Sequence, residues 1–206
     1  MKLLKYLSVF CLLSTSTSAL AVMEIDGDFG YEKTVFGPNR ENSLVSRSYA
    51  GSLAVYFTQH LGIELNYSRS RELTTIDEDR ATTSNSIVLS SSQNRVDRSV
   101  YGVGLRISLG GRKSFIQPAI SLGYARSFSE SSYSLTYNDN NGSQIGVIQS
   151  DVSKARSDNA FGTFALKFRL TRGLSIKGSV RTYFPADDFD KAKDNLKYAA
   201  GFSWMF

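Results

Sequence analysis

Hydrophobic and polar residues alternate with a period of two through much of the chain. From Tyr101 to Leu109, for example, apolar residues at odd positions enclose glycine, arginine and serine at even positions. Successive side chains of a strand point to opposite faces, so this alternation predicts strands with one apolar face and one polar or small face. We predict eight strands, at 25–36, 48–58, 62–73, 97–109, 114–128, 159–170, 174–184 and 196–206.

The links between these predicted strands alternate strictly between short and long. The short links lie at 59–61, 110–113 and 171–173. The long links are rich in Ser, Asn, Asp, Thr and Arg and lie at 37–47, 74–96, 129–158 and 185–195. A soluble sandwich has no reason to place every long loop at one end, whereas short periplasmic turns, longer external loops and an even strand number are typical of a transmembrane barrel. The pattern therefore predicts an all-β fold, an eight-stranded antiparallel up-and-down transmembrane β-barrel.

The two faces of the predicted strands differ in bulk. One face carries large apolar side chains such as Phe164, Phe168 and Phe202, and the other carries Gly, Ala and Ser with single long charged residues between them. The interior of an eight-stranded barrel has room only for tightly interlocking side chains. We therefore expect the bulky face to contact lipid and the small, charged face to line the lumen.

Residues 1–21 have the three parts of a secretory signal peptide. They are a basic start, an apolar run from Tyr6 to Leu13 and the small-residue end Ala19-Leu20-Ala21. The apolar run is too short to span a bilayer. We expect cleavage after Ala21, which leaves residues 22–206 as one barrel domain, and export to the outer membrane of a Gram-negative bacterium.

Composition narrows the chemistry of the exported domain. Cys11, inside the leader, is the only cysteine, and His60, in the predicted turn 59–61, is the only histidine. Thiol catalysis and metal sites built on cysteines or several imidazoles are thereby excluded, and we expect no catalytic residue, no metal and no cofactor. The net charge is +5, but the basic residues form no run of five or six, so we expect no nucleic acid partner.

Charged residues on the predicted lumen face comprise four acids and six bases. Buried charges must be paired or hydrated, because an unpaired charge in a poorly hydrated interior costs several kcal/mol. We interpret the set as a salt-bridge network that plugs the lumen; the alternative is a narrow conductive path with an anion preference from the basic excess. The residues are Asp26, Asp28, Glu32, Glu64, Arg106, Lys167, Arg169, Lys177, Arg181 and Lys197.

The last predicted strand, from Leu196 to Phe206, alternates aromatic residues and ends in phenylalanine. With the leader, the eight alternating strands and the alternation of short and long links, the chain resembles the small outer-membrane β-barrels. These include the transmembrane domain of outer membrane protein A and the OmpX-like and OmpW-like proteins. The resemblance implies that Phe202, Trp204 and Phe206 form a signal for the barrel-assembly machinery. We also expect outer-membrane lipid and lipopolysaccharide as partners, and a host or surface ligand at the long loops.

Two classes of function remain open at this point. The first is a structural or surface-interaction barrel that displays loops 74–96 and 129–158, and the alternative is a narrow pore or transporter for ions or small solutes. Long polar loops favour the first, because recognition residues can vary there without disturbing the barrel. A lipid-modifying enzyme is the outsider, since lipid A deacylase and lipid A palmitoyltransferase also resemble small barrels. His60, however, falls in a turn predicted to be periplasmic, with no neighbouring nucleophile and acid, so we predict no enzymatic activity.

Overall fold

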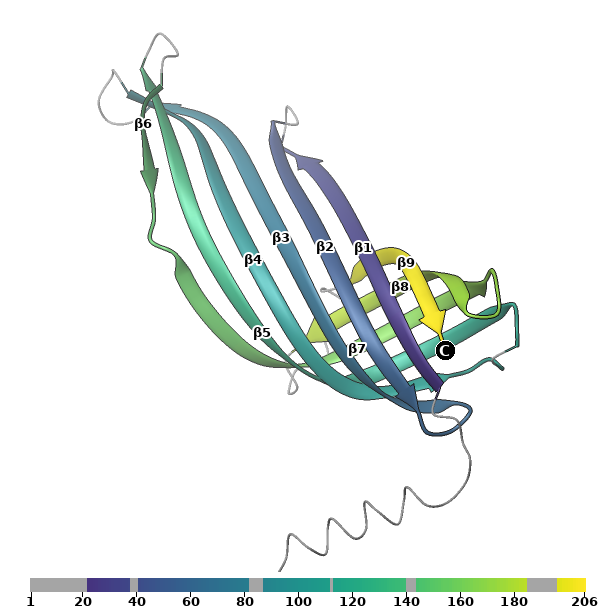
Figure 1. The fold of residues 1–206 in the computed structure, drawn as a ribbon. Helices are drawn as coiled ribbons and strands as arrows, with labels where there is room; N and C mark the ends of the chain where they lie inside the picture. Colours follow the sequence, from purple (N-terminus) through teal and green to yellow (C-terminus); the bar gives the residue numbers. More distant parts are fainter. Residues whose placement is uncertain (1–21, 38–40, 82–86, 112, 140–143, 185–195) are drawn as a thin grey trace, which may run out of the picture.

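The computed structural model describes residues 22–37, 41–81, 87–111, 113–139, 144–184 and 196–206 (Figure 1). The predicted leader and the predicted loop 185–195 lie outside these ranges. No helix in the described part of the chain is long and apolar enough to cross a membrane. The strands there are β1 (Val22–Phe36), β2 (Asn42–Tyr56), β3 (Leu61–Ala81), β4 (Ile87–Ser108), β5 (Ile116–Asp139), β6 (Gln144–Gln149), β7 (Ser153–Arg169), β8 (Leu174–Phe184) and β9 (Lys197–Met205).

Eight of the strands close into an antiparallel barrel, which confirms the predicted fold. The strand order is β4-β3-β2-β1-β9-β8-β7-β5, and a further pairing between β4 and β5 closes the ring. β6 was not predicted; in the described part of the chain it pairs with the far end of β5 alone, where Ser134 lies opposite Gln149. The first and last strands of the chain, β1 and β9, pair with each other from Glu24 opposite Met205 to Phe29 opposite Ala200.

Two of the predicted short links, 59–61 and 171–173, are confirmed as tight turns at one end of the barrel, and the third, 110–113, lies in a longer connection, 109–115, whose residue 112 is outside the described ranges. In the turn between β2 and β3 the backbone N–H groups of Phe57 and Thr58 donate to the Leu61 carbonyl at 3.1 and 3.2 Å. Leu170 donates in the same way to Leu174 at 2.9 Å in the turn between β7 and β8. The start of β1 and the end of β9 lie at this end too, since Val22 lies opposite Tyr56 at the end of β2 and Met205 N–H donates to the Gly173 carbonyl at 2.8 Å.

The predicted boundaries of the long loops 37–47, 74–96 and 129–158 are wrong, because much of each of these three loops is strand. β3 and β4 stay paired as far as Ala81 opposite Val88, and β4 and β5 as far as Ile87 opposite Asp139. Above the lipid both faces of a strand can be polar, so backbone pairing continues where the alternation of hydrophobicity fades. We call the extension formed by 74–81, 87–96, 129–139 and 144–149 the projecting sheet; Figure 1 shows it rising beyond β1, β8 and β9.

The predicted faces of the barrel strands are confirmed. Phe164 and Phe202 point outward, with 47% and 62% of their surface exposed, whereas Lys167 on the opposite face is 1% exposed. Phe184 is an exception: the alternation of Ile176, Val180 and Phe184 in the sequence puts all three on the outward apolar face of their strand, but Phe184 is buried.

One aromatic ring fills part of the lumen. Phe161 packs there with Val100 and Ala125. A Cβ on Gly104 or Gly123 would come within 2.8 or 2.6 Å of the Phe161 ring, so these glycines make the room that the ring needs.

Candidate functional site: the charged lumen

Arg106 of β4 is the hub of the charges inside the barrel. Its Nη1 lies 2.6 Å from Asp26 Oδ2 and 3.1 Å from Glu24 Oε1, both on β1. Its Nε donates to Glu64 Oε2 of β3 at 2.9 Å, and its Nη2 donates to Ser52 Oγ of β2 at 2.9 Å. One guanidinium therefore ties together the four strands that form one side of the lumen.

Two lysines and a second arginine reach the same acids from the opposite wall. Lys167 Nζ of β7 donates to Glu24 Oε1 at 2.6 Å. Lys177 Nζ of β8 lies 3.1 Å from Asp26 Oδ2 and 2.9 Å from Asp28 Oδ2. Arg181 Nη2, also on β8, lies 3.7 Å from Asp28 Oδ2. The ion pairs thus cross the lumen and link its two sides.

The buried part of this system is electrically balanced. We call it the lumen network: Glu24, Asp26, Asp28, Glu64, Arg106, Lys167, Lys177 and Arg181, all less than one-tenth exposed. Its four carboxylates match its four cations. The basic excess that motivated an anion-selective path is therefore absent from the buried lumen.

Seven of the ten predicted lumen charges belong to the lumen network, and three lie outside it. Glu32 is exposed near the end of β1, and Arg169 is half-buried at the turn end of β7. Lys197 is half-buried and pairs with Glu72 at 2.9 Å. All three residues stand at positions of their strands that face the lumen, but they lie toward the ends of the barrel, where water reaches them.

The sequence reasoning missed Glu24, the acid with the most partners. Besides Arg106 and Lys167 it accepts hydrogen bonds from Tyr56 Oη and Ser203 Oγ, each at 2.8 Å. The predicted first strand began one residue after Glu24, so the residue was not assigned to a face. The alternation of Glu24 with Asp26 and Asp28 was nevertheless a usable signal, because all three share one parity.

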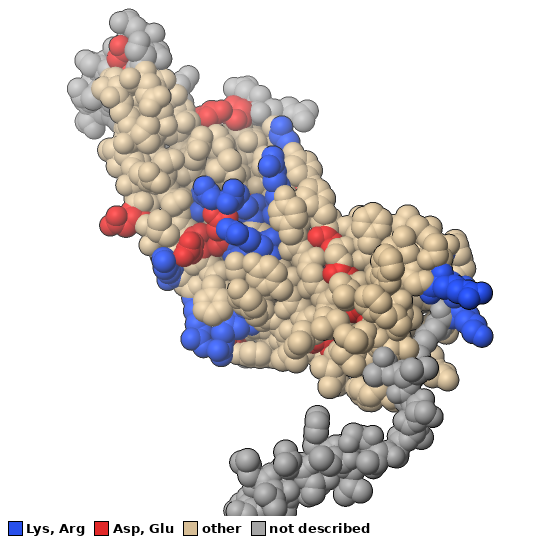
Figure 2. All heavy atoms as spheres, in the orientation of Figure 1, with Lys and Arg blue, Asp and Glu red and all other residues tan. Residues whose placement is uncertain are grey.

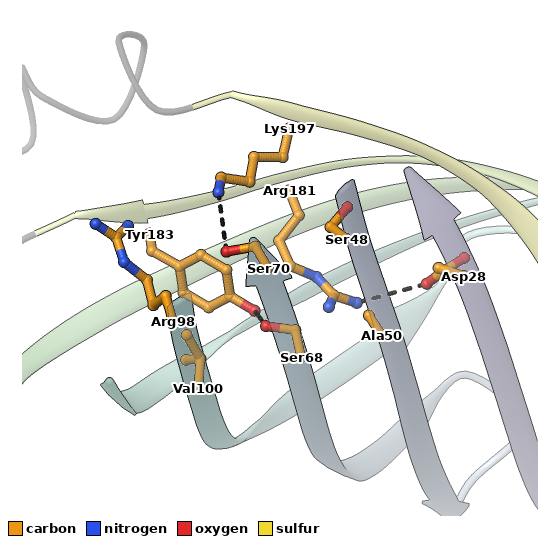
Figure 3. A pocket seen from close by; sticks show the side chains of 10 residues that line it. All are labelled: Asp28, Ser48, Ala50, Ser68, Ser70, Arg98, Val100, Arg181, Tyr183 and Lys197. Atoms are coloured by element: carbon orange, nitrogen blue, oxygen red, sulfur yellow. Dashed lines mark hydrogen bonds and ion pairs between the residues drawn. The ribbon is translucent and has the colours of Figure 1, made fainter. Parts of the chain in front are cut away.

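A small cavity lies beside the lumen network, toward the projecting sheet (Figure 3). Its volume is about 40 Å³, which is room for a few water molecules at most. Tyr183 Oη lies 3.0 Å from Ser68 Oγ across it, and Lys197 Nζ donates to Ser70 Oγ at 3.5 Å. Its other lining residues are Asp28, Ser48, Ala50, Arg98, Val100 and Arg181.

No protein-family model and no curated protein matches the sequence. Among solved structures, the outer membrane protein OprG of Pseudomonas aeruginosa superposes with a TM-score of 0.54 at 13% identity, over 90% of this chain and 96% of that one. The N-terminal β-barrel domain of Pseudomonas aeruginosa OprF superposes with a TM-score of 0.51 at 15% identity, over 90% of this chain and 98% of that one. The chain has the fold of the small outer-membrane β-barrels. At such low identity the likeness concerns the fold alone.

In this barrel fold the predicted assembly residues lie on the outer surface of the closing strand. Phe202, Trp204 and Phe206 are all exposed, and the rings of Trp204 and Phe206 stack with their centroids 6.2 Å apart. Their backbone lies beside β1, so the last strand of the chain pairs with the first. Recognition by the assembly machinery stays a prediction.

His60 lies in the turn between β2 and β3, at the turn end of the barrel. Its Nδ1 is 2.9 Å from the Ser108 carbonyl, and its backbone N–H donates to Thr58 Oγ1 at 3.2 Å. These contacts are those of a turn residue. Among the residues that the structure describes, no group of three or more His, Cys, Asp or Glu side chains is placed to hold a metal ion.

Proposed function

We propose that the protein is an outer-membrane barrel of a Gram-negative bacterium that displays the projecting sheet outside the cell for contact with a surface ligand. The barrel fold, its apolar outer surface and the collection of its short turns at one end support this placement. The balanced lumen network then acts as a structural plug. The observation that carries the proposal is the great length of three neighbouring strands.

These strands far exceed what a membrane requires. β3, β4 and β5 have 21, 22 and 24 residues, whereas β8 and β9 have 11 and 9. A transmembrane strand needs only about 9 to 11 residues. More than half of β5 is therefore available outside the membrane, as ordered sheet and not as loose loop.

The outermost strand of the projecting sheet has features of a contact surface. β6 ends the strand order and pairs only with β5 in the described part of the chain, so one edge of it is open to another strand. Ile145, Val147 and Ile148 on it are all more than half exposed. An open edge with apolar side chains is suited to strand addition by a partner.

The first experiment tests the orientation. The exported domain contains no cysteine, so single cysteines can be labelled with a membrane-impermeant maleimide. We expect Ile148→Cys to react in intact cells and Arg172→Cys, in the turn between β7 and β8, to react only after the outer membrane is permeabilised. Labelling of Arg172→Cys alone in intact cells would reverse the proposed topology.

The second experiment separates display from transport. Adhesion to epithelial monolayers is measured for cells that carry the full chain and for cells that carry a shortened variant. In the variant, 76–92 and 132–150 are each replaced by a two-residue turn, and the two cell populations contain equal amounts of assembled barrel. We expect adhesion to fall with the shortened strands, and the refolded full chain to show no single-channel conductance in planar bilayers. Unchanged adhesion together with discrete conductance steps would favour the narrow pore.

A further inference from the structure

Four arginines gather on the outer surface of the barrel, where β2, β3 and β4 leave the apolar band. We call them the arginine cluster: Arg47, Arg69, Arg71 and Arg95. Figure 2 shows Lys and Arg side chains concentrated over the middle of these strands, around Asp and Glu side chains. Among the described residues Asp97 is the carboxylate that pairs with the cluster, through Arg71 and Arg95. Glu130, directly opposite Asp97 on β5, pairs instead with Lys154 outside the cluster at 3.2 Å.

The strand register forces the positive charges together. Arg47 lies directly opposite Arg71, and Tyr49 lies directly opposite Arg69. Like charges at opposed positions of neighbouring strands are destabilising. Arg71 and Arg95 each donate through Nε to Asp97 at 2.8 Å. Arg47 lies over the Tyr31 ring at 6.0 Å, and within the described ranges no carboxylate pairs with Arg47 or Arg69.

The level of the cluster along the barrel is set by tyrosines. Tyr49, Tyr67 and Tyr101 lie on the same outward face, and the rings of Tyr67 and Tyr101 are 5.0 Å apart. Aromatic girdles of this kind mark the boundary between the apolar core of the membrane and the headgroups. Arg47 and Arg69 are the next outward-facing residues beyond Tyr49 and Tyr67. Their guanidinium groups therefore lie at headgroup depth, against lipid.

The surface between these side chains is hollowed. A depression of about 290 Å³ is lined by Arg47, Tyr49, Arg69, Arg71 and Asp97. A guanidinium presents a planar fork of donors that matches the oxygens of a phosphate group. The ion pairs to Asp97 hold part of the rim in place, which reduces the ordering that a ligand would require.

We infer that the arginine cluster binds the phosphate of a phosphorylated glycolipid headgroup, lipopolysaccharide, in the outer leaflet. Arg126 and Arg156, at a similar level on β5 and β7, serve as the comparison. Arg126 pairs with Asp158 at 2.8 Å, and Arg156 lies over the Phe128 ring at 5.9 Å. The inference rests on the outer-membrane placement and is independent of what the projecting sheet contacts.

The test uses the full exported domain, refolded in detergent and titrated with purified lipopolysaccharide. Arg47→Gln/Arg69→Gln removes two cations and leaves both ion pairs of Asp97 intact, and Arg126→Gln/Arg156→Gln is the matched control. The first variant should lose affinity for lipopolysaccharide by about tenfold or more, because it loses charged hydrogen bonds to the phosphate. The affinity of the control variant should change little. Heat-modifiable migration in gels verifies that both variants form barrels, and Arg69→Gln alone replaces the double variant if that one does not assemble.

Two further probes identify the chemistry and the source of the ligand. Enzymatically dephosphorylated lipopolysaccharide should bind the unchanged protein as weakly as intact lipopolysaccharide binds the double variant. Inorganic phosphate at millimolar concentration should compete poorly, because it lacks the acyl chains that lie against the neighbouring tyrosines. Equal binding of the dephosphorylated lipid, equal loss in the control variant, or full competition by inorganic phosphate would each overturn the inference. None of these results bears on adhesion by the projecting sheet, so the two proposals fail separately.

Discussion

Arg106 in the lumen and Arg71 on the outer surface make the same kind of bond in opposite surroundings. Arg106 lies 2.6 Å from Asp26 with both side chains almost fully buried, and Arg71 lies 2.8 Å from Asp97 with 52% of the Arg71 side chain exposed. Inside the barrel each charged side chain needs an oppositely charged partner, because little water is present to solvate an unpaired charge. On the outer surface, water and dissolved ions solvate and screen the charges. Like charges can therefore lie close together without partners and remain available to a ligand.

The largest expected effect comes from breaking the lumen network at its hub. Arg106→Met should destabilise the folded protein by at least about 3 to 5 kcal/mol, because Glu24, Asp26 and Glu64 lose a buried partner together. Arg71→Met, which removes an exposed ion pair, should cost less than about 1 kcal/mol. Reversible urea unfolding from lipid vesicles measures both. Similar losses for the two variants would remove the distinction between the regions.

Sequence patterns could identify the lumen network in outline because burial imposes a rule on them. Asp26, Asp28 and Arg106 stand at positions whose neighbours must face lipid, so their direction follows from parity alone. Which charges meet does not follow, because pairs such as Lys177 with Asp28 lie 149 residues apart and depend on the register of strands all around the barrel.

The outer regions obey no comparable rule. The sequence contains only a weak signal for the projecting sheet, which is the alternation of Tyr133, Leu135 and Tyr137 inside a predicted loop. The arginine cluster was hidden for the same reason, since Arg47 fell in a predicted loop and its position opposite Arg71 depends on the pairing of β2 with β3.

The second prediction tests the lipid-facing surface against the projecting sheet. Leu166→Arg should cost about 2 to 4 kcal/mol, because the residue faces lipid between Phe164 and Phe168. Val147→Arg on β6 should change the free energy of unfolding by no more than about 0.5 kcal/mol, because Val147 already contacts water. Unfolding from lipid vesicles again decides. A harmless Leu166→Arg would mean that the outward face of β7 does not contact lipid.

The smallest effect is expected at Glu72, which lies between the two regions at the outer rim of the lumen. Partial burial acts to raise the pKa of the Glu72 carboxyl, but the hydrogen bond and positive charge of Lys197, with Arg98 nearby, outweigh burial and lower that pKa. A pKa lowered by folding means that the carboxylate stabilises the native state at pH values above its unfolded pKa of about 4.3. This contribution is lost as the pH falls through the lower native pKa.

Glu72→Gln should therefore weaken the fold by less than about 1 kcal/mol at neutral pH, with the difference from the unchanged protein shrinking toward zero as the solution is acidified below pH 4. The size is limited because Glu72 and Lys197 are 33% and 30% exposed, so water screens their attraction. Unfolding curves for both proteins across that pH range measure the difference directly. A constant difference at all pH values would mean that Glu72 contributes by packing, and a difference of several kcal/mol would place the rim with the buried network instead of with the water-exposed surface.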